Sequence, residues 1–113
     1  MAKNVIEYIS QKYGDKLEFL WEKFEDGAIC RRQDNKKWYV VFMLARASKL
    51  GLQGDEKVEI LNLKPLEPEK VVDFKCILPG YHMNKKYWVS ILLEKCENMH
   101  QIFDLIDQSY AFA

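Results

Sequence analysis

The chain has 113 residues, enough for one hydrophobic core and not for two, so we expect a single domain over residues 1–113. Hydrophobic residues make up 49% and charged residues 30%, a balance that argues against a disordered chain. The 17 basic and 17 acidic residues cancel, which argues against a polycation that coats nucleic acid through net charge. No apolar run approaches the roughly 20 residues that a membrane helix needs, so no membrane association is expected.

The start of the chain and its cysteines indicate a cellular compartment. Residues 1–4 lead directly into an amphipathic pattern rather than into the apolar core of a signal peptide. Three cysteines are an odd number, and no export signal precedes them. We therefore expect Cys30, Cys76 and Cys96 to be reduced thiols in a cytoplasmic protein.

The first quarter of the chain predicts one helix and one aromatic-rich segment. A capping-box pattern at residues 4–7 begins an apolar stripe of helical spacing that stops at Gly14, so a helix is expected between them. Helical spacing recurs in the next segment without good caps, at Leu17, Leu20, Trp21 and Phe24. We expect a helical turn or an aromatic-rich connection there.

Strand patterns occupy the middle of the chain. Residues 28–32 and 36–45 flank Gln33-Asp34-Asn35, and the Asp-Asn pair tolerates the positive φ of a tight hairpin. Residues 38–44 are apolar at both parities, which predicts a central strand covered on both faces. Residues 48–55 contain two glycines and are expected to form a loop, and residues 57–64 alternate as a third strand.

The last third of the chain predicts a short helix, a strand and a long helix. Pro68 suits the first turn of a helix that continues to about Lys75. Residues 77–79 lead into a loop at Gly80, and residues 87–93 form the fourth clear strand. A helix over residues 97–110 places an apolar face inward. The order α-β-β-β-α-β-α, with hairpin-length connections, predicts an α+β fold whose antiparallel sheet of about four to six strands has helices packed on one side.

Motifs for catalysis or metal binding are weak. His82 and His100 are the side chains that titrate near neutrality unaided, and a thiol partner could come from Cys76 or Cys96. Cys96 and His100 lie one helical turn apart, but a structural zinc site normally needs four ligands, and no paired C-x-x-C occurs. We expect no enzymatic activity, no cofactor and no metal.

Basic charge is concentrated in two segments. Residues 28–50 carry six basic residues against Asp34 alone, and residues 80–90 add two lysines without an acid. A basic hairpin tip has the shape of a wing that grips a phosphate backbone. The run of residues 80–88 adds amide, imidazole and ring groups, which can bond to phosphates or stack on bases. We expect contact with duplex DNA through these residues: Arg31, Arg32, Lys36, Lys37, Lys64, Tyr81, His82, Asn84, Lys85 and Lys86.

A second interpretation of residues 80–88 remains open. The same run could line a pocket or contact patch of a protein- or small-ligand-binding module, a monomer or a weak homodimer, in which the lysines only give solubility. The zero net charge and the 13% aromatic content support this alternative. An enzyme is a third interpretation, and it needs an acidic or thiol partner within hydrogen-bond reach of His82.

Residues 79–88, Pro-Gly-Tyr-His-Met-Asn-Lys-Lys-Tyr-Trp, closely resemble a signature of the MmcQ/YjbR-like proteins, Pro-Gly-Tyr-His-[Met/Leu]-Asn-Lys-x-x-Trp. Further matches follow in family order along nearly the whole chain, at residues 21–24, 35–38, 48–52, 60–64 and 105–110. The chain departs from the family at residues 65–68, where Cys-Asp-Pro is common, and at residues 94–97, where an Asp-Gly-Ser type of turn is common.

The resemblance implies an α+β fold with an antiparallel sheet, in the CyaY-like or double-wing group. The double-wing name refers to similarity to the DNA-binding domain of a phage transcription factor, so DNA binding is implied by fold analogy. The resemblance implies no established activity.

Overall fold

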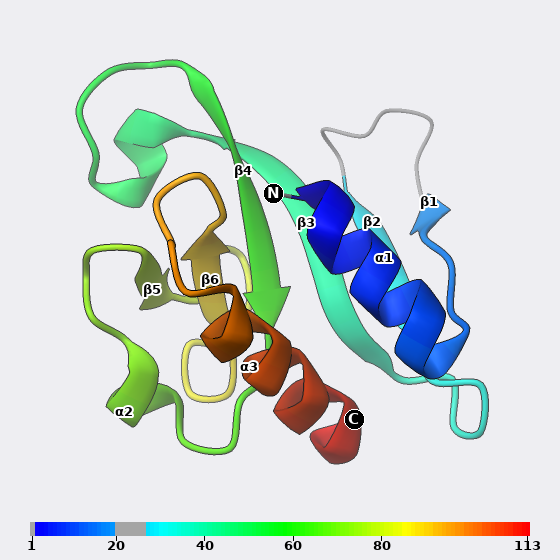
Figure 1. Ribbon diagram of the computed structural model, residues 1–113. Coiled ribbons are helices and arrows are strands. Elements are labelled where there is room, and N and C mark those ends of the chain that lie inside the picture. Colours follow the sequence, from blue (N-terminus) through cyan, green and yellow to red (C-terminus); the bar gives the residue numbers. More distant parts are fainter. Residues whose placement is uncertain (1, 20–26) are drawn as a thin grey trace.

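The chain folds around one antiparallel sheet, seen in the computed structural model in Figure 1. The structure describes residues 2–19 and 27–113. Its elements in chain order are α1 (Ala2–Tyr13), β1 (Glu18–Phe19), β2 (Ala28–Arg31), β3 (Trp38–Arg46), the 3-10 helix η2 (Ala47–Leu50), β4 (Lys57–Leu63), α2 (Pro68–Val71), β5 (Ile77–Pro79), β6 (Val89–Leu92) and α3 (Met99–Phe112). The strand order in the sheet is β1-β2-β3-β4-β6-β5. This is the predicted α+β class, with six strands.

The two long helices lie on the same face of the sheet (Figure 1). Val5 and Ile9 of α1 and Ile102 and Ile106 of α3 are buried against strand residues such as Phe42. The apolar positions of both helices recur at helical spacing, and burying that stripe supplies most of the stability of an amphipathic helix. The predicted packing of helices on one side is therefore confirmed.

The opposite face is covered by connections rather than by a long helix. Ala45 of β3 and Ile60 of β4 pack there, with Leu50 and Leu52 of the η2 connection against them. The first half of β3 is consequently buried at both parities, from Tyr39 to Phe42. This confirms that the strand is central and covered on both faces.

Several boundaries differ from the sequence prediction. Glu18–Phe19 pairs with β2 as strand β1, so a helical turn is wrong at these two residues. Leu20, Trp21 and Phe24 lie outside the described residues, so the choice between a helical turn and an aromatic-rich connection stays a prediction there. The positive φ of the β2–β3 connection falls on Lys36, at 62°, rather than on the Asp-Asn pair. These differences arise because short edge strands and turns depend on their partners more than on their own periodicity.

The region around α2 also differs from the prediction. The helix ends at Val71, before Lys75, and Ile77–Pro79 forms strand β5 instead of a plain lead into the loop. The Oδ1 atom of Asp73 accepts hydrogen bonds from the backbone nitrogens of Lys75, Cys76 and Ile77, at 2.8, 3.0 and 2.9 Å. The Asp73 side chain thus offers these nitrogens an alternative to helical hydrogen bonding.

The expectation of three reduced thiols is wrong for two of them. Cys76 and Cys96 form a disulfide with a Cα–Cα distance of 5.3 Å. Cys76 precedes β5 and Cys96 follows β6, and the antiparallel pairing of these strands brings the two positions together. Cys30 is a free, buried thiol, and burial, followed by the charges of Asp15 and Glu18, raises its pKa to about 12.

Candidate nucleic-acid interface

The sheet register brings the two basic segments to one end of the sheet. Val40, near the start of β3, pairs with Leu63 at the end of β4, and Leu63 pairs with Val89 at the start of β6. The β2–β3 hairpin tip, Lys64 and the loop of residues 80–88 therefore share that end (Figure 1). We call the following set the basic end: Lys36, Lys37, Lys64, Lys85 and Lys86.

The two arginines of the hairpin are engaged within the protein. Arg31 Nε donates to Glu18 Oε2 at 2.9 Å. Arg32 forms a two-pronged ion pair with Asp34, at 2.9 and 2.6 Å, and its Nη1 donates to the Tyr110 carbonyl at 2.9 Å. Its guanidinium carbon also lies 4.6 Å from the centroid of the Tyr110 ring. Both arginines thus stabilise the fold, and we leave them out of the proposed contact.

The five lysines of the basic end differ from these arginines. In the part of the chain that the structure describes, none of the five takes part in an ion pair. Lys64 Nζ lies 5.6 Å from the ring centroid of Trp88, and Lys86 Nζ lies 5.6 Å from that of Tyr87. A cation–π contact at an exposed site is weak, and the ammonium group keeps N–H donors that can still bind a phosphate.

Two residues of the family signature shape the 80–88 loop. The Gly80 nitrogen donates to the Trp88 carbonyl at 3.1 Å, and a Cβ on Gly80 would lie 3.0 Å from both Trp88 Cβ and that carbonyl oxygen. The Asn84 carbonyl accepts from the nitrogens of Tyr87 and Trp88, while its side-chain oxygen accepts from the Lys86 nitrogen at 3.0 Å. Both oxygen atoms of Asn84 therefore accept hydrogen bonds from backbone nitrogens of the same loop.

Tyr81 and His82 differ in their exposure. The Tyr81 nitrogen donates to Ser90 Oγ at 2.7 Å, and its half-buried ring packs on the second core cluster. Ser90 Oγ in turn donates to Asn62 Oδ1, which places a buried polar pair under the loop. The exposed His82 has a φ of 57° and lies against the Tyr81 ring, with 4.0 Å between centroids.

The thiol partners considered for a histidine are not nucleophiles in this structure. Both Cys76 and Cys96 are bound in the disulfide, and a sulfur in a disulfide cannot act as a thiolate. Among residues 2–19 and 27–113, no group of three or more His, Cys, Asp or Glu side chains could hold a metal ion. No helix of these residues is long and apolar enough to cross a membrane.

A groove passes beside three lysines of the basic end. Its first hollow, about 530 Å³, lies among Leu66, Tyr87 and Phe112. The second, about 420 Å³, lies between α2 and the 80–88 loop, and the third, about 220 Å³, reaches Tyr81. The hollows share lining residues and therefore lie next to one another. Those shared residues are Pro68, Glu69 and Lys86 between the first two, and Phe74, Pro79 and Lys85 between the last two.

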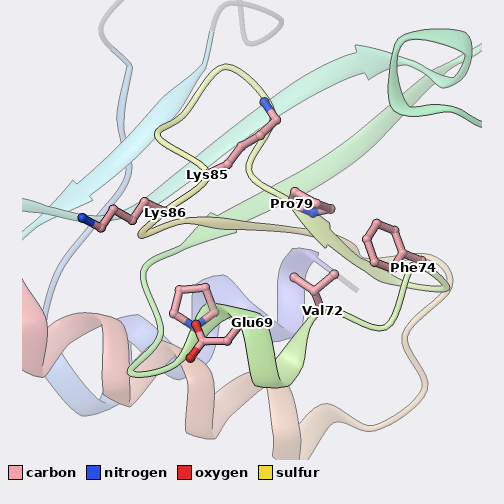
Figure 2. A pocket seen from close by; sticks show the side chains of 7 residues that line it. Glu69, Val72, Phe74, Pro79, Lys85 and Lys86 are labelled. Atoms are coloured by element: carbon pink, nitrogen blue, oxygen red, sulfur yellow. The ribbon is translucent and has the colours of Figure 1, made fainter.

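Figure 2 shows how the middle hollow is built. Val72, Phe74 and Pro79 lie close together on one wall, and Lys85 and Lys86 come from the loop on the other side, with their side chains extending in different directions. The sequence analysis missed Phe74 and Val72, because it placed both in a helix continuing to Lys75. The exposure of Phe74 follows only from the early end of α2.

The chain belongs to a known protein family. The YjbR family model matches residues 10–112, and the chain is a member of the YjbR family. The chain is 39% identical over 110 residues to the uncharacterized protein YyaQ of Bacillus subtilis strain 168, covering 96% of this chain and 93% of YyaQ.

Solved structures agree with this assignment. A crystal structure of a Pseudomonas syringae protein, 37% identical, matches with a TM-score of 0.88 over 99% of this chain and 97% of that chain. A solution NMR structure from the same species, also 37% identical, matches with a TM-score of 0.81 over 99% and 91%. A Deinococcus radiodurans protein, 18% identical, shares the fold with a TM-score of 0.70 over 99% and 77%. The resemblance to MmcQ/YjbR-like proteins is thus confirmed, while DNA binding and the double-wing description stay predictions.

Proposed function

We propose that this protein binds DNA, with the five lysines of the basic end contacting phosphates. The observation that carries the proposal is that these lysines lie at one end of the sheet without an ion pair among the described residues. Lysines that neutralise phosphates release condensed counterions, which is the main source of non-specific affinity for DNA.

Cations elsewhere on the protein support this proposal by contrast. Lys12 pairs with Asp107 at 2.8 Å, Arg46 with Asp55 at 3.2 Å, and Lys70 with Glu67 at 2.7 Å. The net charge of zero therefore hides an uneven distribution along the sequence, with an excess of five basic residues over residues 28–50 and of two over residues 80–90. A local excess of one sign creates a field that attracts a polyanion even when the total charge is zero.

Fluorescence anisotropy of a labelled duplex of about 20 base pairs, at about 50 and about 200 mM NaCl, tests the proposal. We expect low-micromolar binding at the lower salt, with log K falling against log salt by about 0.9 for each phosphate contact. The double variant Lys85→Glu, Lys86→Glu should reduce that slope by about 1 to 2. Lys3→Glu is the matched control, because Lys3 is an exposed lysine near the start of α1. Absence of binding to any DNA at the lower salt contradicts the proposal.

A second candidate, a protein- or small-ligand-binding module, draws support from the apolar groove. Leu66 is 58% exposed and Phe74 is 73% exposed, so the groove presents apolar surface to solvent. A ligand held mainly by this surface would bind with little dependence on salt. The anisotropy titration therefore separates the two functions.

A cytoplasmic location is part of the DNA proposal, and the disulfide is its sharpest test. The structure has Cys76 and Cys96 joined, and a reducing compartment opens such a bridge, so a cytoplasmic pool of the protein should contain both residues as free thiols. Alkylation of intact cells, followed by mass spectrometry, counts the blocked thiols. Recovery of the native pool with the Cys76–Cys96 bridge intact would contradict a cytoplasmic location.

A further inference from the structure

Exposed apolar side chains gather along the groove. Leu66, Phe74, Tyr87 and Phe112 are 58%, 73%, 49% and 47% exposed, and all four line its hollows. Large apolar side chains are more often buried, and clustering of exposed ones marks an interaction surface. The groove is therefore the candidate interaction surface of this part of the molecule.

Phe74 carries a second sign of function. Its φ of 57° lies in the left-handed region, which a bulky residue occupies only at a cost in backbone energy. Backbone hydrogen bonds hold that conformation, since the nitrogens of Asp73 and Phe74 both donate to the Ile77 carbonyl, at 3.0 and 3.1 Å. The chain thus keeps a strained backbone that presents a ring to solvent over two of the three hollows.

The charge along the groove is mainly positive. Lys49, Lys64, Lys85 and Lys86 stand along its three hollows, and Glu69 is the one acid among the lining residues. The occupant that complements this surface is a polyanion that also exposes flat apolar faces. Unpaired nucleic acid has both properties, because its phosphates are charged and its bases can stack on aromatic rings.

A paired duplex fits the groove poorly. The base faces of a duplex are stacked inside the double helix. Its phosphates can contact the lysines, but its bases cannot cover the apolar side chains of the groove. Single-stranded binding proteins combine a positive groove with aromatic side chains in this way. Resting on the proposed function, we infer that the groove takes unpaired bases and that the protein prefers single-stranded DNA to duplex.

An extended peptide is a poorer occupant than a single strand. Peptides often bind by adding a strand to a free sheet edge, and β5 is the edge strand beside this groove. The Ile77 carbonyl is already taken by residues 73 and 74, the Ile77 nitrogen donates to Asp73 Oδ1 at 2.9 Å, and Pro79 has no N–H. The edge that a peptide strand would need is therefore closed.

The test compares fluorescein-labelled oligothymidine of about 20 nucleotides with a duplex of the same length, by anisotropy at about 50 mM NaCl. We expect the single strand to bind at least about 10-fold more tightly than the duplex. Phe74→Asn should weaken single-strand binding by about 5-fold or more while leaving duplex binding unchanged. Asparagine is chosen because it tolerates the left-handed backbone, so the ring is removed without new strain.

Tyr87→Ser is a second variant, because Tyr87 is half exposed and its loss leaves the core intact. Phe19→Ala is the matched control, since Phe19 is 58% exposed in β1, at the other edge of the sheet. Equal binding of both DNA forms, unchanged by Phe74→Asn and Tyr87→Ser, would overturn the inference and leave the proposed function standing. Absence of binding to either form would overturn both. Binding of poly-L-glutamate that Phe74→Asn weakens as strongly as it weakens oligothymidine binding would assign the groove to an acidic peptide instead.

Discussion

Asp107 joins the two long helices through three side chains. It accepts from Tyr8 at 2.8 Å, from Tyr13 at 2.6 Å and from Lys12 at 2.8 Å. Burial alone would raise the pKa of Asp107, but the hydrogen bonds from Lys12, Tyr13 and Tyr8 outweigh it and lower that pKa. Because the residue holds helices and touches no part of the groove, it reports on stability alone.

Asp107→Asn should lower the free energy of unfolding by about 1 to 3 kcal/mol at neutral pH, since hydrogen bonds to a charged acceptor are lost. The folded-state pKa lies below the unfolded value of about 3.9, so this stabilisation is full above that value and disappears as the pH falls through the folded pKa. Urea denaturation at pH 7 and at about pH 3 measures it. Asp104→Asn is the control, because Asp104 is exposed and bonds Gln108 of its own helix. A penalty that is the same at both pH values would contradict this assignment.

Among the residues of the 79–88 signature, Gly80 has the clearest steric reason to be a glycine. Gly80→Ala places a methyl group 3.0 Å from the Trp88 carbonyl oxygen and Cβ, closer than such atoms normally approach. We expect a loss of about 1 to 3 kcal/mol, the usual cost of overpacking, because Trp88 cannot give way without moving β6.

Gly14→Ala serves as the comparison in the same denaturation experiment. No atom lies within 4 Å of a Cβ at Gly14, but its φ of +72° ends helix α1. That variant should lose about 1 kcal/mol through backbone strain, and Gly14→Asn should recover part of it. A Gly80→Ala protein as stable as the parent would show that the loop is not held as the structure has it.

Among the elements, strand length decides how much the sequence could reveal. β3 with nine residues, β4 with seven and α3 with 14 carry enough periodicity to be recognised from the sequence. β1 and β5 have two and three residues, too few for any pattern, and they exist because β2 and β6 lie beside them.

The disulfide and the groove could not be predicted from the sequence, for a related reason. Cys76 and Cys96 are 20 residues apart, and only the β5–β6 pairing makes them neighbours. From the sequence, Phe74 is expected to be an apolar residue of a helix. In the structure the Asp73 side chain accepts hydrogen bonds from the backbone nitrogens that would continue the helix, so Phe74 lies outside it. By contrast, four of the five lysines of the basic end could be named from the clustering of basic charge in two segments of the sequence, because charged residues stay exposed in almost any fold.

The Cys76–Cys96 bridge encloses the 80–88 loop and should stabilise the protein. Closing a loop of 20 residues is worth about 3 kcal/mol by the chain-entropy estimate. The double variant Cys76→Ser, Cys96→Ser should therefore unfold at lower urea, and a reducing agent should shift the parent protein and leave the variant unchanged. If the urea midpoint of the parent protein does not change with the reducing agent, the result would contradict the presence of the bridge.

At the scale of the whole molecule, topology turns a neutral chain into one with a basic end. β3 begins, β4 ends and β6 begins at the same place, so segments up to 50 residues apart in sequence present their lysines together. The hairpin tip is tied to the end of α3, where Asn35 Nδ2 donates to the Ala113 carbonyl at 3.1 Å. Phe112 in turn lines the groove with Lys64 and Lys86. The C-terminal end of α3 therefore lies between the basic hairpin and the groove and contacts both.

The most direct test maps amide chemical shifts of the labelled protein as oligothymidine is added, which a chain of 13.4 kDa readily allows. DNA binding at the basic end predicts that the largest shifts fall on residues 36–37, 64 and 80–88, with Phe74 moving alongside them. They should diminish together as salt is raised. Shifts confined to the outer faces of α1 and α3, or no shifts at low salt, would contradict the claim that this end of the sheet binds nucleic acid.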